Sequence, residues 1–258
     1  MNRTISLPVA ILGLISATVT TLPAASLDVF YTDFENGTPA GFSPGPLTSR
    51  VSSEGYALYG FGSYMLISQG GTNTGNAVTL TLTGLPAHTS VELDFLLAII
   101  NSWDGWAPQP IGHDLFNVEI DGVSVSRNHF SNLWLGDMVN PPPGTGIIFQ
   151  TNNVGFPAGQ DQARWPDSAY RMTLRALPHT GSTLTIRWYA DGNGWQGGTE
   201  PTDEFWGIDN LRVRLNNVSQ AVPIIATQPA PQTVPAGGIA TFSVSASAQA
   251  SSASIDSA

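Results

Sequence analysis

Ser90-Val91-Glu92-Leu93-Asp94-Phe95-Leu96-Leu97-Ala98-Ile99-Ile100 is the stretch that decides the fold class. Every second residue from Val91 to Ile99 is apolar, so an extended chain places all of these side chains on one face. A helix would scatter the same residues around its axis, because its period is 3.6 residues rather than two. The stretch therefore predicts a long strand with one buried face.

The same alternation recurs in shorter stretches that are bounded by turn residues, and no stretch after the N-terminal region has a convincing helical period. Asp121-Gly122 follows one of these stretches directly, which is typical of a tight hairpin turn. Many short strands joined by Gly- and Pro-rich loops, without a fixed repeat, predict an all-β, two-sheet antiparallel jelly-roll sandwich. Trp134 to Asp167 is poor in alternation, so we expect a long excursion there at one end of the sandwich. The alternating stretches are Val78–Leu82, Phe116–Ile120, Tyr170–Leu174 and Leu184–Trp188.

An apolar run near the N-terminus has the composition of a secretory signal peptide. Met1-Asn2-Arg3 precedes apolar residues from Ile5 to about Val19, and Ala24-Ala25-Ser26 supplies small residues after them. The run is too short to read as a membrane-spanning helix. We therefore predict a signal peptide at residues 1–25 and a secreted or cell-surface location, with a buried N-terminal helix as the alternative.

Composition excludes several classes of function. The 258 residues contain no cysteine, which excludes disulfide scaffolds, thiol nucleophiles and thiolate metal sites. Lys and Arg number 9 against 19 Asp and Glu, a net charge of −10 that argues against nucleic acid and anionic membranes as partners. Hard cations and neutral ligands remain, and we expect no membrane insertion of the mature domain.

Three carboxylates near the two ends of the main domain form a candidate ion site. Counting by two from Asp209 gives Leu211 and Val213, so a regular strand turns Asp209 toward the core. A buried carboxylate must be hydrogen-bonded, protonated, or paired with a cation. Asp33 and Glu35 would share one face of an early strand and could complete such a site. We favour an ion held by Asp33, Glu35 and Asp209 over a hydrogen-bonded corner.

A second set of polar and aromatic residues lies at expected strand ends beside loops. Exposed tryptophans with nearby carboxylates suit a sugar-binding surface, because sugar C–H faces stack on the indole ring. Filling of the core is the alternative for each tryptophan, and turn capping is the favoured interpretation for the aspartates, including Asp203. The candidate ligand-binding residues are Trp103, Asp104, Trp106, Asp114, Trp195 and Glu204.

Catalytic motifs are missing from the sequence. It contains no Gly-rich phosphate loop and no His-Glu-x-x-His pair. We therefore assign no catalytic residue. If a glycoside hydrolase were hidden here, Asp104, Asp114 and Glu204 would be the candidate acid and base groups.

Several motifs together resemble jelly-roll modules of the MAM and carbohydrate-binding kinds. They are Asp33-Phe34-Glu35-Asn36-Gly37, Trp103-Asp104-Gly105, Asp114 to Gly122, and Trp206-Gly207-Ile208-Asp209-Asn210-Leu211-Arg212-Val213. In those families an acidic first strand and an Asp in the last strand hold a structural calcium, so the resemblance implies Ca²⁺ at Asp33, Glu35 and Asp209. The cysteines of MAM modules are missing here.

The C-terminal part differs in character from the main domain. Pro223–Pro229 and Val234–Val244 resemble the opening strands of bacterial immunoglobulin-like modules. We thus expect a jelly-roll domain at 26–215, a linker at 216–222, and an incomplete immunoglobulin-like segment with an Ala/Ser-rich tail at 223–258. The expected function is an exported, calcium-stabilised module that binds polysaccharide or another cell-surface ligand. A structural spacer or adhesion module is the alternative, and a hydrolase is less favoured.

Overall fold

A computed structural model of the protein describes residues 25–44, 48–69, 75–106, 112–132, 140–155, 166–195, 204–218, 222–227, 229–230, 232–234 and 237–249. The predicted signal peptide lies outside these residues, apart from Ala25. No helix in the described part is long and apolar enough to cross a membrane.

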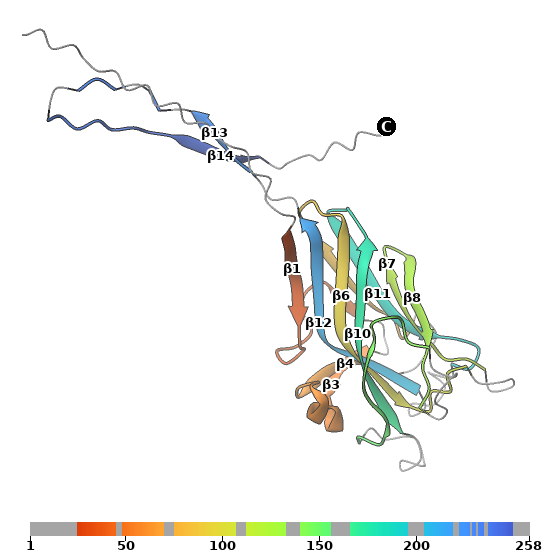
Figure 1. The fold of residues 1–258 in the computed structure, drawn as a ribbon. Coiled ribbons are helices and arrows are strands. Elements are labelled where there is room, and N and C mark those ends of the chain that lie inside the picture. The colour runs from red at the N-terminus through yellow and green to blue at the C-terminus, as the bar shows by residue number, and fades with distance from the viewer. Residues whose placement is uncertain are drawn as a thin grey trace, which may run out of the picture.

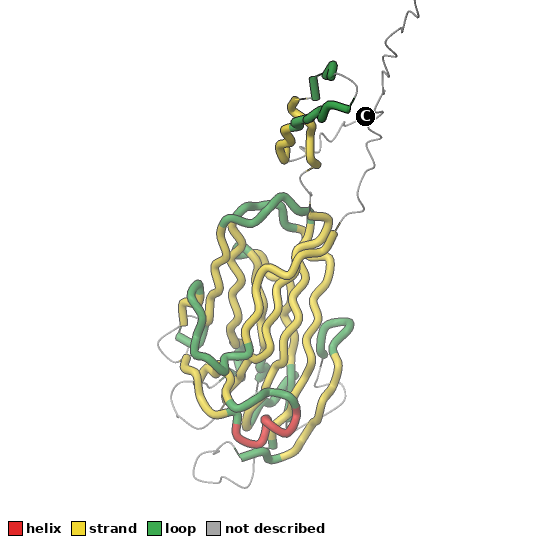
Figure 2. The backbone as a smooth tube through the Cα atoms, turned by 90° about the vertical axis from the view of Figure 1, so that its left-hand side faces the viewer, coloured by secondary structure: helices red, strands yellow, loops and turns green. Residues whose placement is uncertain are grey.

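Two antiparallel sheets form a β-sandwich, which confirms the predicted all-β class (Figures 1 and 2). One sheet has seven strands in the order β3-β4-β12-β6-β10-β9, with β1 also paired to β12. The other has five strands in the order β2-β5-β11-β7-β8. The strands of the first sheet are β1 (Ala25–Thr32), β3 (Thr48–Ser52), β4 (Tyr64–Gln69), β6 (Ser90–Asn101), β9 (Gly146–Asn152), β10 (Asp167–Pro178) and β12 (Glu204–Val218). Those of the second are β2 (Phe42–Pro44), β5 (Val78–Thr83), β7 (Leu115–Ile120), β8 (Val123–His129) and β11 (Thr183–Asp191).

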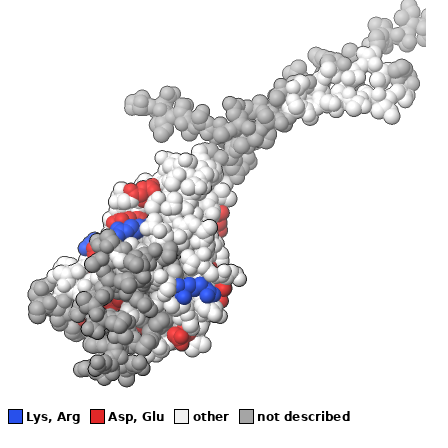
Figure 3. All heavy atoms as spheres, turned by 180° about the vertical axis from the view of Figure 1, so that it is seen from behind, with Lys and Arg blue, Asp and Glu red and all other residues white. Residues whose placement is uncertain are grey.

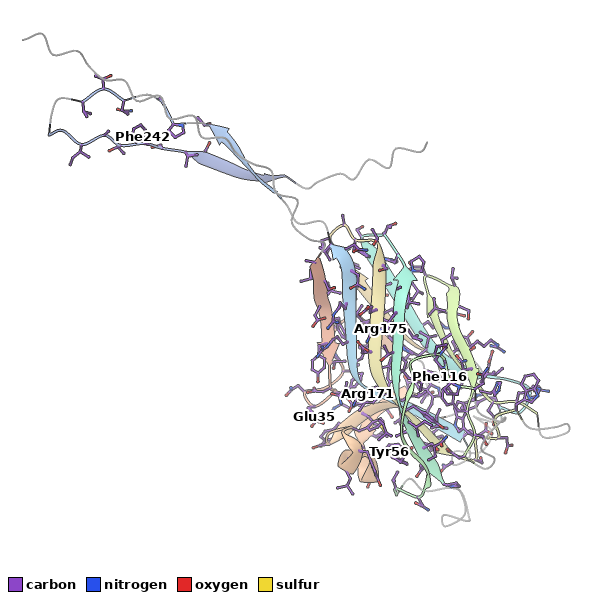
Figure 4. The ribbon with its side chains drawn as sticks, viewed as in Figure 1. Glu35, Tyr56, Phe116, Arg171, Arg175 and Phe242 are labelled. Carbon is purple, nitrogen blue, oxygen red and sulfur yellow. The ribbon has the colours of Figure 1, made fainter. Side chains whose placement is uncertain are left out.

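The core lies between the two sheets. The alternating apolar row of β6, from Val91 to Ile99, faces Phe116 of β7 and Trp188 of β11 within one buried cluster. Each such large apolar side chain stabilises the fold by about 1.5–3 kcal/mol when it leaves water. A smaller buried cluster covers the outer face of the seven-stranded sheet, beneath the 3₁₀ helix η1 (Glu54–Tyr59). Figure 4 labels Tyr56 of this outer cluster and Phe116 of the core.

The β7–β8 hairpin forms as the sequence predicts. Asp121 and Gly122 connect the two strands and have φ angles of 50° and 79°, both in the left-handed region that a tight two-residue hairpin turn uses.

The expected excursion from Trp134 to Asp167 contains a strand that alternation did not reveal. β9 pairs with β10 at the edge of the seven-stranded sheet. Ile147 on this strand is 61% exposed, whereas Phe149 is buried in the outer cluster. An edge strand with few buried side chains has little alternation to detect.

The C-terminal strand of the sandwich is longer than the expected domain boundary. β12 continues to Val218, so Asn216, Asn217 and Val218 belong to the strand rather than to a linker, because Ala25 of β1 pairs with Val218. β13 (Val222–Thr227) and β14 (Ser245–Gln249) then form a two-stranded sheet that Figure 1 draws beyond this end of the sandwich. Residues 241–244, expected to be a strand, are exposed and not paired.

Candidate functional site

The first acidic cluster consists of Asp33, Glu35 and Asp209, and it lies at a junction in the seven-stranded sheet. On one side of β12, residues 205–208 pair with β4 and residues 211–218 pair with β1. Asp209 stands between these two partners, and the chain turns away from β1 directly after Thr32. The topology therefore brings the end of β1 to the middle of β12.

Asp209 reaches this junction through a β-bulge rather than through regular alternation. The pairing of β12 with β6 shifts between Asp209 and Arg212, and Asn210 has φ 49°. Ile208 and Leu211 both face the core as a result, so the prediction that Asp209 shares the face of Leu211 was wrong. Asp209 instead lies on the other face of the sheet, fully buried.

Asp33 and Glu35 do not share a strand face either, because β1 ends at Thr32 and a turn follows. Phe34 has φ 54°, and its backbone N–H donates to Thr32 Oγ1. The Asp33 carboxylate accepts the Glu35 N–H at 3.2 Å, a local bond typical of aspartate in turns. The turn keeps both acidic residues near Asp209, and the charges of Asp33 and Glu35 both raise the pKa of that residue.

The turn is fixed from outside by neighbouring strands. Glu35 Oε1 accepts the N–H groups of Ser63 (2.6 Å) and Tyr64 (3.0 Å), and Arg50 Nη2 donates to the Glu35 carbonyl at 2.9 Å. Figure 4 shows Glu35 between the end of β1 and the β3 region. A pocket of about 450 Å³ opens beside the turn, lined by Tyr31, Thr32, Asp33, Asn36, Gly37, Thr38 and Pro39.

The electrostatics of Asp209 favour a bound proton or cation. The pKa of Asp209 is raised to about 8, chiefly by burial and also by the charges of Asp33 and Glu35, against the lowering effect of the Asn210 N–H that donates to Asp209 Oδ1. Asp209 Oδ2 is buried and has no hydrogen-bond partner in the described part of the chain. These residues fit a cation, because an orphaned buried oxygen lies beside two further carboxylates. As placed, however, the three carboxylates are not all within 4.8 Å of one another.

The second acidic cluster consists of Asp104, Asp114 and Glu204, of which the first two are ten residues apart and the third lies far along the chain. Among the described residues, these three are the acidic or histidine set with potential ligand atoms that all lie within 4.8 Å of one another. They are 7%, 0% and 1% exposed. Asp203, which we grouped with them from the sequence, lies outside the described residues.

Close backbone packing brings this second cluster together. Asp104 follows β6, pairs with Ser131 across an isolated bridge, and its N–H donates to Asp114 Oδ2. The Gly194 N–H donates to the His113 carbonyl at 3.0 Å. A Cβ on Gly194 would stand 2.7 Å from His113 N and 2.9 Å from Asp114 Oδ1, so only glycine fits there.

The three candidate tryptophans have different environments. Trp103 is fully buried, donates from Nε1 to the Phe205 carbonyl at 2.7 Å, and packs edge-on against the partly buried Trp195 at 5.1 Å. Trp106 is 52% exposed. Its ring stacks on His113 at 3.8 Å and 16°, and His129 lies 5.3 Å away. Of the six predicted ligand-binding residues, Trp106 is therefore the one with a large exposed face; Trp103 and the three acids are buried.

One buried residue that supports this end gave no signal in the sequence. Asn132 donates from Nδ2 to the carbonyls of Ile99 (3.0 Å) and Asn101 (2.8 Å), and its N–H donates to the Trp103 carbonyl. It fixes the chain that follows β8 against the end of β6. The sequence gives it only a place among loop residues, where asparagine is common.

The chain matches no protein-family model and no curated protein. Among solved structures it is similar to the K2 cleaved adhesin domain of Lys-gingipain, with 15% identity, 73% of this chain and 97% of that chain covered, and a TM-score of 0.41. It is also similar to the family 35 carbohydrate binding module from Clostridium thermocellum, with 10% identity, coverages of 71% and 96%, and a TM-score of 0.32.

A third similar structure contains the CBM22-1 and GH10 modules of xylanase 10B from Clostridium thermocellum, with 8% identity and a TM-score of 0.35. The match covers 73% of this chain and spans 28% of the length of that one. With TM-scores this low, none of these similarities carries an argument about function. The function is therefore inferred from the strand pairing and the side-chain contacts of this chain itself.

Proposed function

We propose that this chain is an exported carbohydrate-binding module, with the exposed ring of Trp106 as the platform on which the sugar stacks. The single observation that supports the proposal is the way in which the protein holds this ring. Trp106 stacks on His113 at 3.8 Å, so one indole face is held by the protein while the residue remains 52% exposed. An aromatic side chain fixed in this way binds an apolar sugar face with little loss of side-chain entropy.

The charge of the chain supports a neutral ligand. The net charge is −10, and the face drawn in Figure 3 carries few charged side chains, which lie scattered among uncharged ones. Polyanionic ligands would be repelled over the distance at which such charges act. A neutral polysaccharide, or a neutral glycan on a cell surface, meets no such barrier.

We also propose that Ca²⁺ is held at the first acidic cluster, where Asp33, Glu35 and Asp209 would supply carboxylate oxygens. Calcium takes six to eight oxygen ligands, and its charge would offset both the burial of Asp209 and the repulsion from Asp33 and Glu35, which together raise the pKa of Asp209. Bound there, it would tie the turn after β1 to the bulge of β12. Support comes from the orphaned Oδ2 of Asp209.

The second acidic cluster supports binding rather than hydrolysis. A glycosidase needs two carboxyl groups that reach the sugar from opposite sides. Asp104, Asp114 and Glu204 are at most 7% exposed, so they suit a role in fixing the loops beneath Trp106.

The test is a panel of neutral plant, algal and host polysaccharides presented to the full chain. We expect binding to at least one of them, and we expect Trp106→Ala to weaken it at least tenfold, which corresponds to about 1.4 kcal/mol. Phe242→Ala is the matched control, since Phe242 is 59% exposed but lies in the C-terminal segment, away from Trp106. Silence across the whole panel would refute the glycan proposal and favour a structural spacer.

A further inference from the structure

Two buried histidines meet at the end of the sandwich opposite Trp106. His88 lies in the loop between β5 and β6, and His179 directly follows β10. They are 4% and 8% exposed. His88 Nε2 and His179 Nδ1 are 2.7 Å apart, the ring centroids are 4.9 Å apart, and the two ring planes are inclined by 20°.

The outer nitrogen of each ring faces only hydrogen-bond acceptors. His88 Nδ1 lies 2.6 Å from the Pro86 carbonyl oxygen. His179 Nε2 lies 3.1 Å from the Thr183 carbonyl oxygen and 3.1 Å from Asp121 Oδ2. Carbonyl and carboxylate oxygens cannot donate, so each outer nitrogen must carry a hydrogen.

The number of protons on the pair follows from this arrangement. A neutral imidazole carries one N–H, and both of these N–H groups are already used on the outer sides. Two neutral rings would then direct bare lone pairs at each other across 2.7 Å, a distance that belongs to a strong hydrogen bond. One further proton must lie between the facing nitrogens.

We propose that His88 and His179 share one proton and carry a single positive charge, as a buried clasp that opens when this proton is lost. His179 is the ring that faces the carboxylate of Asp121, so the charge is best placed there. Within the described residues, Asp121 is the charged side chain that contacts the pair. It is itself held by the Thr185 N–H, which donates to Asp121 Oδ1 at 2.9 Å.

A metal ion between the facing nitrogens does not fit the same geometry. Zinc lies about 2.0 Å from each imidazole nitrogen. Two nitrogens on a tetrahedral ion would therefore be separated by more than 3 Å, whereas these are 2.7 Å apart. A proton fits without any movement of the rings.

The clasp connects both sheets at the end from which the chain continues to β13. His88 precedes β6 of the seven-stranded sheet, while Asp121 belongs to the β7–β8 turn of the other sheet. The His179 N–H donates to the Thr89 carbonyl, and the Thr89 N–H donates to the carbonyl of Asn216 near the end of β12. Loss of the proton would place lone pair against lone pair and release these loops together. Histidine ionises near neutral pH in an unstructured chain, so this end of the sandwich becomes sensitive to pH.

The test is ¹⁵N NMR of the histidine side chains in the full chain, starting at pH 5.5. We expect both nitrogens of His179 to be protonated, Nδ1 alone to be protonated in His88, and a scalar coupling between the facing nitrogens. His113 and His129 are internal controls that should show no such coupling.

As the pH rises to 9 the coupling should disappear, and hydrogen exchange of the His179 backbone amide, corrected for pH, should increase at least tenfold. Asp121→Asn removes the counter-charge while keeping an acceptor, and should move the loss of coupling to lower pH. Two unprotonated facing nitrogens at pH 5.5, or Zn²⁺ binding at this pair in wild type, would overturn the proposal.

Discussion

Replacing Asp209 by asparagine is expected to stabilise the protein when calcium is absent. The amide keeps an oxygen for the Asn210 N–H, which now donates to Asp209 Oδ1 at 2.7 Å. It replaces the orphaned Oδ2 with an N–H₂ group that can donate toward Asp33 and Glu35. The substitution therefore keeps the existing hydrogen bond and supplies a side chain that is neutral at every pH, whereas Asp209 must hold a proton to avoid a buried charge.

The size of this effect follows from the pKa of Asp209, which is raised from 3.8 to about 8. The folded protein keeps a proton that the unfolded chain releases, so the free energy of unfolding falls as pH rises from about 4 through about 8. Each pH unit in this window is worth about 1.4 kcal/mol. At pH 7 the upper limit is about 4 kcal/mol, and rearrangement of the polar groups around the buried carboxyl group reduces the expected gain for Asp209→Asn to about 2 kcal/mol.

Urea unfolding with and without calcium provides the assay. In chelator, the variant should be more stable than wild type at pH 7 and should lack the fall between pH 5 and pH 8. With calcium at one hundred times its dissociation constant, wild type should gain about 2.7 kcal/mol, because only the folded state binds the ion. The variant should gain much less from calcium, so the difference in free energy of unfolding between the variant and wild type should shrink or change sign.

Asp28→Asn is the matched control, because Asp28 lies on the adjacent β1 but is exposed and paired with Arg214 at 2.8 Å. Its loss should change stability by less than about 1 kcal/mol and leave the calcium response intact. A destabilised Asp209→Asn in chelator at pH 8 would refute the electrostatic reasoning. A wild-type protein whose free energy of unfolding does not change with calcium would refute the proposed calcium site.

Two further substitutions test the packing that supports the fold. Asn76→Ala should lower the free energy of unfolding by roughly 3 kcal/mol in urea titrations. The Asn76 side chain donates to the Ala190 carbonyl, accepts the Ala190 N–H, and accepts from Trp206 Nε1 at 3.1 Å. A loss below about 1 kcal/mol would contradict this role. Gly192→Ala should lower the free energy of unfolding by about 3 kcal/mol or more, because Gly192 has φ 130° and a Cβ there would overlap the His113 carbonyl. Gly122→Ala is the control: Gly122 has φ 79° and open space around it, so the loss should be about 1 kcal/mol. Equal losses in the two variants would contradict the steric argument.

The sandwich could be predicted because its central strands each bury one full face. The row from Val91 to Ile99 and the run from Phe116 to Ile120 both show a period of two, and both form strands as expected. The short strands β2, β3 and β9 could not be predicted. They lie near the sheet edges and bury few side chains, so pairing with a neighbour determines their conformation more than their own pattern does.

The candidate sites were predicted less well, for a different reason. Asp104 and Asp114 lie in the connection between β6 and β7 and Glu204 begins β12, and no sequence spacing encodes such a meeting. Trp103 and Trp106 are three residues apart with similar neighbours, yet one is fully buried and the other is 52% exposed. The difference depends on the Phe205 carbonyl, which accepts from Trp103 Nε1 although it is 102 positions away in the sequence, and on the His113 ring, on which Trp106 stacks.

The bulge at Asp209 links the fold to the proposed ion site. β12 must pair with β4 over residues 205–208 and with β1 over residues 211–218. A strand without irregularity would turn either Ile208 or Leu211 out of the core, because they are three positions apart. The extra residue at the bulge keeps both inside, and it leaves Asp209 on the opposite face at the gap between β4 and β1. The same gap is where the turn carrying Asp33 and Glu35 leaves β1. The irregularity that satisfies the core thus also turns Asp209 toward the acidic turn after β1, which is why a count of alternate residues placed Asp209 on the wrong face.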